Sequence, residues 1–279
     1  MKLGVVGLGA MGAGIAQLGV EAGLETVGHE LDAARGEAAR DRIAHFLTRK
    51  VEKGQLEQAT RDAAVARLQV TTDLAELATC DVVIEAAFED LSVKHELFRA
   101  LESVVRDDAI LATNTSALSV TEIASVLQRP ERAVGMHFFN PAPLMPLVEI
   151  VRAERTSDAA FETAFQLGAT LGKTPIRCSD TPGFVVNRVL IPLLNDCVRV
   201  LDETGVTPED LDAGMRYGAG WPMGPCALLD LVGADVHVHA SEALYEKLRE
   251  PRMAPPPRLV AIRNEGLLGR KSGRGFYEY

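Results

Sequence analysis

Short apolar runs alternate with longer amphipathic segments along the first half of the chain. The runs have the length and β-branched character of buried strands, and the segments between them have the spacing of helices. Such alternation is typical of a doubly wound, mostly parallel sheet with helices on both faces, so we predict an α/β fold for this region. The predicted strands are Leu3–Gly7, Thr26–Glu30, Asp81–Ala86, Ala109–Asn114 and Ala133–Phe138.

One long segment departs from the alternation. Residues Ala33–Leu68 are polar and favour helix, with an interruption near Gly54. This pattern predicts a helical hairpin, inserted between the second and third of these strands, that stands away from the sheet.

The pattern changes after the last strand-like run, Pro175–Cys178, where turn-forming residues cluster at 178–183. From there on the chain favours helix. We therefore predict two domains, residues 1–180 and residues 181–279, the second of them all-α. Its first helix should kink at Pro192 and pack through apolar residues at helical spacing. These residues are Val186, Leu190, Leu193, Leu194, Val198 and Leu201.

Composition and charge narrow the class of protein. The 279 residues are 47% hydrophobic and 24% charged, which fits a globular protein and excludes disordered, collagenous and fibrous ones. The net charge of -10 argues against a nucleic-acid-binding surface, so any polyanionic ligand must find a local basic patch.

The sequence also carries expectations about location. No apolar run approaches the roughly 20 residues that span a bilayer, and Met1-Lys2 leads into a strand-like run rather than a signal peptide. We expect a cytoplasmic protein with no membrane partner. The cysteines form no C-x-x-C pair, so we expect buried thiols and no metal site; they are Cys80, Cys178, Cys197 and Cys226.

A glycine-rich segment directly follows the first predicted strand. It reads Gly7-Leu8-Gly9-Ala10-Met11-Gly12 and leads into a helix-compatible run. The first glycine permits a tight turn, the second lets backbone approach a pyrophosphate, and the third lets the helix pack close to the strand. The pyrophosphate then lies at the helix N-terminus, where unpaired N–H groups and the helix dipole favour negative charge. We therefore predict a Rossmann-type dinucleotide-binding domain.

A carboxylate at the end of the second predicted strand indicates which dinucleotide is bound. Glu30 follows the glycines by about twenty residues and can accept hydrogen bonds from a ribose diol. It would repel a 2′-phosphate, so NAD is favoured over NADP, although Arg35 is close in the sequence.

The candidate proton acceptor is His137, which stands at the end of a predicted strand and before two phenylalanines. Histidine is the usual group for taking a hydroxyl proton while hydride leaves the carbon, and it works better when a carboxylate orients its other nitrogen. Glu149 is the candidate partner, because a charge within an apolar run is costly unless it is paired. A core histidine bonded to backbone is the alternative interpretation.

Six segments, in this order along essentially the whole chain, closely resemble the 3-hydroxyacyl-CoA dehydrogenases, including the short bacterial 3-hydroxybutyryl-CoA dehydrogenases. They are Gly7–Gln17, Glu85–Lys94, Asn114–Ser116, His137–Pro141, Asp180–Arg188 and Gly269–Tyr277.

The resemblance implies a Rossmann domain and a helical domain that forms a homodimer. It also implies NAD-linked interconversion of an (S)-3-hydroxyacyl-CoA, for which 3-hydroxybutyryl-CoA is expected, and a 3-ketoacyl-CoA such as acetoacetyl-CoA. By matching position, His137 is the general base, Glu149 its partner, and Ser116 and Asn187 bind the reacting oxygens. Contacts with the dinucleotide are implied for Glu30, Glu89, Lys94, Ser116, Asn140 and Lys271.

A basic cluster on the predicted hairpin suits a CoA ester. By resemblance Lys53 meets the CoA phosphates, and Arg49 and Lys50 beside it supply the local positive charge that a chain of net charge -10 needs. Phe46 departs from the family, whose members often have a serine there that touches CoA. A solvated helix face is the alternative interpretation of the cluster, and Ser116 and Asn187 could instead be helix-capping residues.

Three other functions compete. The 3-hydroxyisobutyrate and 6-phosphogluconate dehydrogenases share the glycine motif, but they use a catalytic lysine where this chain has Asn187 and Arg188. An L-gulonate 3-dehydrogenase or lambda-crystallin-like protein would act on a sugar acid, which leaves the Arg49–Lys53 cluster without a reason. A non-catalytic NAD-binding protein would need no proton acceptor.

Overall fold

The computed structural model describes all 279 residues, and the chain divides into two compact units, Met1–Thr181 and Pro182–Tyr279. The observed division falls one residue after the one that the turn cluster predicts. None of the helices combines the length and the hydropathy that a membrane span requires.

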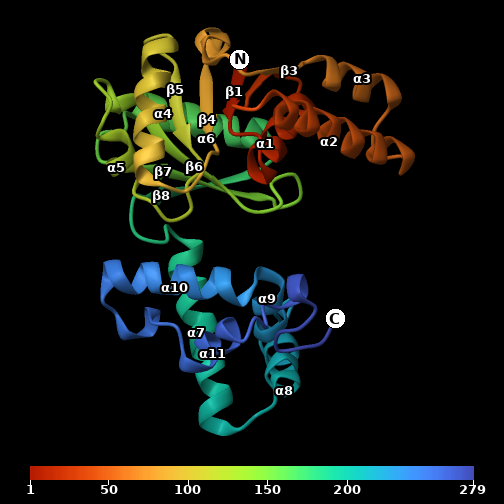
Figure 1. Ribbon diagram of the computed structural model, residues 1–279, viewed down its shortest axis with the longest axis vertical. Coiled ribbons are helices and arrows are strands. Elements are labelled where there is room, and N and C mark those ends of the chain that lie inside the picture. The colour runs from red at the N-terminus through yellow and green to blue at the C-terminus, as the bar shows by residue number, and fades with distance from the viewer. The chain divides into compact units, whose positions relative to one another are not determined.

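The first unit is built on one eight-stranded sheet of order β3-β2-β1-β4-β5-β6-β7-β8 (Figure 1). All neighbouring strands are parallel except β6 and β7, which run antiparallel. The mostly parallel α/β sheet predicted from the alternating pattern is therefore confirmed. The strands are β1 (Lys2–Val6), β2 (Glu25–His29), β3 (Leu68–Thr71), β4 (Val82–Glu85), β5 (Ile110–Thr113), β6 (Ala133–Phe138), β7 (Leu147–Arg152) and β8 (Thr174–Ser179).

Helices cover both faces of this sheet because successive residues of a buried strand point to opposite sides. On β4, Ile84 packs in the same apolar core as Ile15, whereas the neighbouring Val83 packs in a second core with Phe98. The helices of this unit are α1 (Ala10–Glu21), α2 (Ala33–Glu52), α3 (Gln58–Ala66), α4 (Leu91–Val104), α5 (Val120–Ala124) and α6 (Asp158–Thr170), with 3₁₀ turns η1 (Leu74–Thr79) and η2 (Pro130–Arg132).

The predicted helical hairpin is confirmed as α2 and α3, which extend outward from the sheet in Figure 1. α2 ends at Glu52, and Gly54 turns the chain with a φ of +66°, a conformation that glycine adopts without strain. The boundary after the hairpin was wrong, since Leu68 begins strand β3, which the sequence pattern did not predict.

The second unit is all-α, as predicted. Its apolar core contains Leu194, Val198 and Leu229, but Leu193, which the helical spacing placed on the packed face, is 36% exposed. α7 continues through Pro192 without a break. The elements are α7 (Val186–Thr204), α8 (Pro208–Ala213), the π-helical turn η3 (Gly214–Gly218), α9 (Pro225–Val232), α10 (Ala234–Leu248), η4 (Pro251–Met253), α11 (Pro257–Asn264) and η5 (Arg270–Ser272).

A buried histidine should make the stability of the second unit sensitive to acid. The ring of His237 is buried against Asn195, with 2.9 Å between Nε2 and Oδ1, and burial lowers its pKa from 6.5 to about 4. The unfolded chain therefore takes up this proton first as the pH falls. We expect full stability above pH 6.5 and a loss of about 3 kcal/mol by pH 4 from this group alone.

Denaturant unfolding across pH 4 to 6.5 measures this effect. His237→Gln, which cannot titrate, should flatten the dependence of unfolding free energy on pH. His239→Gln, a change at an exposed histidine of the same helix, should leave it as in the wild type. Equal slopes in all three proteins would contradict the assignment.

Candidate active site

The glycine-rich loop between β1 and α1 has the geometry that a dinucleotide needs. Gly7 has a φ of +85°, and a Cβ at Gly12 would lie 1.8 Å from the carbonyl oxygen of Gly7. Both positions therefore require glycine. A Cβ at Gly9 would meet nothing within 4 Å, and no side chain caps the N-terminus of α1. The loop thus fits a pyrophosphate at the helix N-terminus.

Glu30 lies directly after β2, beside this loop. Its Oε2 accepts a hydrogen bond from the backbone N–H of Leu8 at 3.0 Å, and its side chain is largely buried. Arg35 is mostly exposed, with 3.9 Å from its Nη2 to Glu30 Oε2. The carboxylate is thus held where a ribose would follow the pyrophosphate, and its charge opposes a 2′-phosphate.

Sequence reasoning missed Arg42 on α2, which donates hydrogen bonds to the carbonyls of Leu8 at 3.2 Å and Gly9 at 3.3 Å. These contacts tie the hairpin to the dinucleotide loop. No local signal identified them, because Arg42 is one of several arginines on a polar helix and only the folded chain brings it to the loop.

His137 and Glu149 form a buried pair on adjacent strands. They stand opposite each other in the antiparallel register of β6 and β7, with 2.7 Å between Nδ1 and Oε2. Glu149 is 0% exposed and His137 is 6% exposed. A carboxylate can only accept, so Nδ1–H donates to it and the histidine tautomer is set by this bond. The predicted pairing of His137 with Glu149 is therefore present.

Phe139 and Cys178 lie beside this pair. The ring of Phe139 lies 4.6 Å from that of His137 between centroids. Burial, followed by the charge and hydrogen bonding of Glu149, raises the pKa of Cys178 to about 12, so this thiol stays protonated beside the carboxylate. Asn114 Oδ1 accepts from the backbone N–H of Phe138 at 2.9 Å, which ties the turn after β5 to the end of β6.

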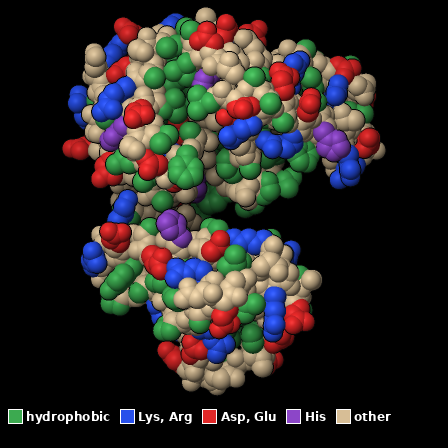
Figure 2. All heavy atoms as spheres, in the orientation of Figure 1, with side chains coloured by type: hydrophobic (Ala, Val, Ile, Leu, Met, Phe, Trp, Pro, Cys, Tyr) green, Lys and Arg blue, Asp and Glu red, His purple; other side chains and the backbone are tan.

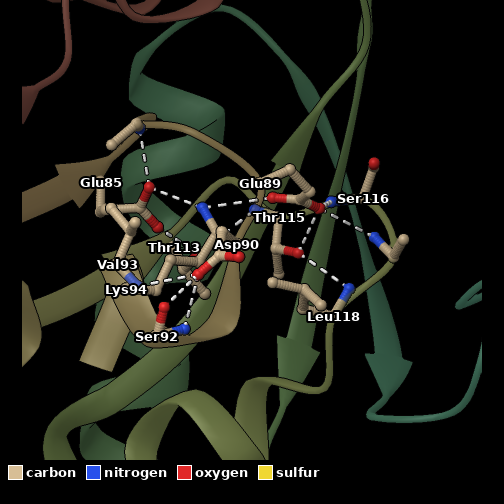
Figure 3. A network of polar contacts seen from close by, with 12 residues as sticks. Glu85, Glu89, Asp90, Ser92, Val93, Lys94, Thr113, Thr115, Ser116 and Leu118 are labelled. Atoms are coloured by element: carbon tan, nitrogen blue, oxygen red, sulfur yellow. Dashed lines mark hydrogen bonds and ion pairs between the residues drawn. The ribbon is translucent and has the colours of Figure 1, made fainter. Parts of the chain in front are cut away.

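Ser116 lies in that turn, and Glu89 holds its backbone. Glu89 Oε1 accepts from Thr115 Oγ1 at 2.6 Å and from the N–H groups of Ser116 at 2.9 Å and Ala117 at 3.2 Å (Figure 3). Although burial opposes it, the Lys94 ammonium and these hydrogen bonds hold the pKa of Glu89 below its usual value. Glu89 and Ser116, both predicted site residues, are thus in direct contact.

Lys94 is buried rather than directed at solvent. Its Nζ lies 2.6 Å from Glu85 Oε1 and 3.2 Å from Glu89 Oε2. Two carboxylates therefore compensate its charge within the protein, which weakens the expectation that Lys94 attracts an anionic ligand. Its direct contact with the dinucleotide stays a prediction.

Asn140 follows β6 and precedes a cis proline, Pro141, in the loop that leads to β7. Lys173, which sequence reasoning missed, anchors this loop by donating to the carbonyls of Ala142 at 2.7 Å and Met145 at 2.9 Å. Burial lowers the pKa of Lys173. Two hydrogen bonds from a buried lysine therefore hold the loop that carries Asn140.

The basic residues of the hairpin do not form one uniform patch. Lys50 pairs with Glu21 of α1 at 2.6 Å, and Arg49 lies 3.6 Å from Glu52. Lys53 is exposed at the C-cap of α2. Figure 2 shows charges of both signs interspersed on the face drawn. Of the three predicted CoA-binding residues, Lys53 and Arg49 are thus exposed, whereas Lys50 is directed toward α1.

The second unit carries the other two predicted site residues. Asn187 lies in the first turn of α7, and Lys271 lies in η5, where its Nζ is 2.5 Å from Asp235 Oδ1. Asp230 pins the tail that holds Lys271 by accepting from the backbone N–H of Tyr277 at 2.9 Å. No group of three or more His, Cys, Asp or Glu side chains is arranged to hold a metal ion.

Comparison with known proteins matches both units. The NAD binding domain of 3-hydroxyacyl-CoA dehydrogenase matches residues 2–181, and the C-terminal domain of that family matches residues 183–279. The chain is 44% identical over 280 residues to 3-hydroxybutyryl-CoA dehydrogenase of Mycobacterium tuberculosis, covering 100% of this chain and 98% of that one. It is 41% identical over 279 residues to the probable 3-hydroxybutyryl-CoA dehydrogenase of Deinococcus radiodurans, covering 100% of both.

A solved structure is similar over the same span. The crystal structure of (S)-3-hydroxybutyryl-CoA dehydrogenase PaaH1 from Ralstonia eutropha matches with a TM-score of 0.96 and 39% identity, covering 100% of this chain and 98% of that one.

Proposed function

Because this chain belongs to the 3-hydroxyacyl-CoA dehydrogenase family, we propose that it transfers a hydride between NAD and an (S)-3-hydroxyacyl-CoA, most readily 3-hydroxybutyryl-CoA. The observation that carries the proposal is the buried pair of His137 and Glu149, 2.7 Å apart, in the same unit as a dinucleotide loop. A protein that only bound NAD would gain nothing from a proton acceptor with its own carboxylate.

The two side chains of this pair divide the proton chemistry. With Nδ1 directed at Glu149, Nε2 of His137 takes the hydroxyl proton of the substrate. Glu149 is fully buried, so its charge stabilises the resulting imidazolium with little screening by water. In the reverse direction the imidazolium returns the proton to the 3-keto oxygen.

The cofactor is held by groups of the first unit. Gly7–Gly12 and the start of α1 would bind the pyrophosphate, and Glu30 would accept hydrogen bonds from the adenosine ribose. When bound, NAD accepts the hydride that leaves the substrate carbon. The roles of Ser116, Asn140, Asn187 and Lys271 toward substrate or cofactor stay predictions.

The direct test is a spectrophotometric assay of the purified chain with (S)-3-hydroxybutyryl-CoA. We expect absorbance of reduced nicotinamide to rise with NAD and to rise far more slowly with NADP, because Glu30 opposes the 2′-phosphate. L-gulonate is the competing substrate. No rise with the CoA ester, or a faster rise with L-gulonate, would contradict the proposal.

Lys53 gives a prediction for CoA recognition. Lys53→Glu should raise KM for 3-hydroxybutyryl-CoA by about tenfold at low salt, because a cation near the phosphates is replaced by an anion. The matched control is the pantetheine thioester of the same acid, which lacks the nucleotide phosphates. Its KM should change by less than about twofold; an equal rise for both substrates would show that Lys53 does not meet the CoA phosphates.

We also propose a homodimer through the second unit. Val189, Leu193 and Val200 lie on one face of α7 and are 59%, 36% and 37% exposed, which leaves an apolar stripe that only Asp196 interrupts. A partner copy would cover this stripe. Sedimentation equilibrium should give the molecular mass of a dimer, and the mass of a monomer would contradict the proposal.

A cytoplasmic location stays a prediction. The four cysteines are buried and none forms a disulfide, which agrees with that prediction.

A further inference from the structure

Glu85 is a fully buried carboxylate at the end of β4 for which the proposed chemistry has no use. It is 0% exposed. Its Oε1 accepts from Lys94 Nζ at 2.6 Å and from the backbone N–H of Ala87 at 2.7 Å, and its Oε2 accepts from Thr113 Oγ1 at 2.7 Å. Burial of a carboxylate is costly, and a buried ion pair is weak evidence for added stability. The arrangement therefore calls for another reason.

The contacts of Glu85 connect it to the predicted site on one side. A Cβ at Gly7 would lie 2.8 Å from the carbonyl oxygen of Ala86, so the turn that Glu85 holds after β4 backs directly onto the dinucleotide loop. Because Ala87 donates to Glu85, the carboxylate fixes this turn from inside the protein.

On its other side the chain of contacts leads to Ser116. Lys94 forms ion pairs with both Glu85 and Glu89. Glu89 in turn accepts hydrogen bonds from the hydroxyl of Thr115 and the backbone N–H of Ser116 (Figure 3). Thr115 in turn accepts from the N–H of Leu118 at 3.0 Å. These hydrogen bonds therefore hold the backbone of the turn around Ser116 from the side of the protein interior.

The start of α4 sets the position of Lys94 in this chain of contacts. Asp90 is the N-cap, and its Oδ1 accepts from the N–H groups of Ser92 at 2.9 Å and Val93 at 3.1 Å. The helix therefore begins at a defined residue. Lys94 then lies in the next turn of the helix, with its side chain 2% exposed between the two glutamates.

We propose that Glu85, Lys94, Glu89 and Thr115 form a buried relay that positions Ser116 for turnover. The four residues act through one another, and Glu85 and Thr115 touch neither substrate nor cofactor in this role. The proposal rests on the proposed function, because it takes turnover as the quantity that positioning serves. Ser116 itself is exposed, whereas Thr115 beside it is 1% exposed. The turn therefore makes Ser116 accessible and keeps Thr115, which supports it, inside the protein.

Thr115 allows a test with a matched control. Thr115→Val removes the hydroxyl that joins Glu89 to Leu118 and should lower kcat by about thirtyfold, since a displacement near 1 Å at a reacting group has an effect of this order. Thr115→Ser restores the hydroxyl and should return kcat to within about threefold of the wild type. The affinity for NADH should fall much less than kcat in Thr115→Val, because the pyrophosphate and ribose contacts at Gly7–Gly12 and Glu30 are untouched.

The control is Thr156, another buried threonine with two hydrogen bonds. Its hydroxyl donates to the carbonyl of Ala133 at 2.7 Å and accepts from the N–H of Ala153 at 2.9 Å. Thr156→Val should lower the melting temperature and leave kcat within about threefold of the wild type. A Thr115→Val variant with the kcat of Thr156→Val, or a Thr115→Ser variant as slow as Thr115→Val, would overturn the relay.

Two further measurements keep the relay testable if Thr115→Val does not fold or if the wild type does not turn over the CoA ester. Glu85→Gln should lower kcat by a similar factor; wild-type kcat would overturn the relay. Hydrogen exchange of the amides of Ser116 and Ala117 should speed up by about tenfold in Glu85→Gln and not in Thr156→Val. Unchanged exchange would refute the relay, whereas an inactive wild type would refute only the proposed function.

Discussion

Replacing His137 with glutamine should lower kcat for oxidation of 3-hydroxybutyryl-CoA by about a thousandfold or more, since general base catalysis is worth about 10²- to 10⁴-fold. Glutamine fills a similar volume and can still donate to Glu149, so the β6–β7 pair of strands should stay intact. The affinity for NADH, measured by fluorescence titration, should stay within about threefold of the wild type because the dinucleotide loop is untouched.

The control for this substitution is His239→Gln, at an exposed histidine of α10, which should leave kcat unchanged. A His137→Gln variant that keeps a tenth or more of wild-type kcat would refute the assignment of His137 as the base. A variant that loses turnover and NADH binding together would point to misfolding instead, which the melting temperature would reveal.

Replacing Glu149 with glutamine should lower kcat by about a thousandfold, a loss comparable to that in other His–carboxylate pairs. An amide can accept from Nδ1–H but supplies no charge for the imidazolium. It can also donate to Nδ1 and so favour the wrong tautomer. KM for the CoA ester should change much less than kcat, because the loss falls on the transition state.

Glu149→Asp separates charge from shape. Aspartate keeps the negative charge but is shorter by one methylene, so we expect a smaller loss of kcat than with glutamine. A Glu149→Gln variant as active as Glu149→Asp would show that the charge of Glu149 is dispensable, and the role given to the pair would be wrong.

The parallel sheet could be predicted from the sequence because its central strands are buried on both faces. Their apolar runs, such as Val82–Ile84, stand out against polar helices. Strand β3 was not predicted because it is not buried in this way. It lies at the edge of the sheet, is four residues long, and reads Leu-Gln-Val-Thr with only Leu68 buried, so it leaves no apolar run.

The candidate site likewise contains some residues that the sequence could predict and others that it could not. His137 and Glu149 could be predicted because each breaks a local rule, a histidine at a strand end and a charge in an apolar run. The relay could not, because Glu85, Lys94 and Thr115 come from β4, α4 and the turn after β5, and their meeting depends on the strand order. The one local signal was Glu85 itself, a charge that ends a fully apolar strand.

The most direct test of the central claim follows the hydrogen atom at C3 of the substrate. The purified chain would be incubated with NAD and (S)-3-hydroxybutyryl-CoA carrying deuterium at C3, and the products separated and weighed by mass spectrometry. We predict that the deuterium appears in the reduced nicotinamide and that the acetoacetyl-CoA carries none. Reduced nicotinamide without deuterium, or no reduced nicotinamide at all, would contradict the account.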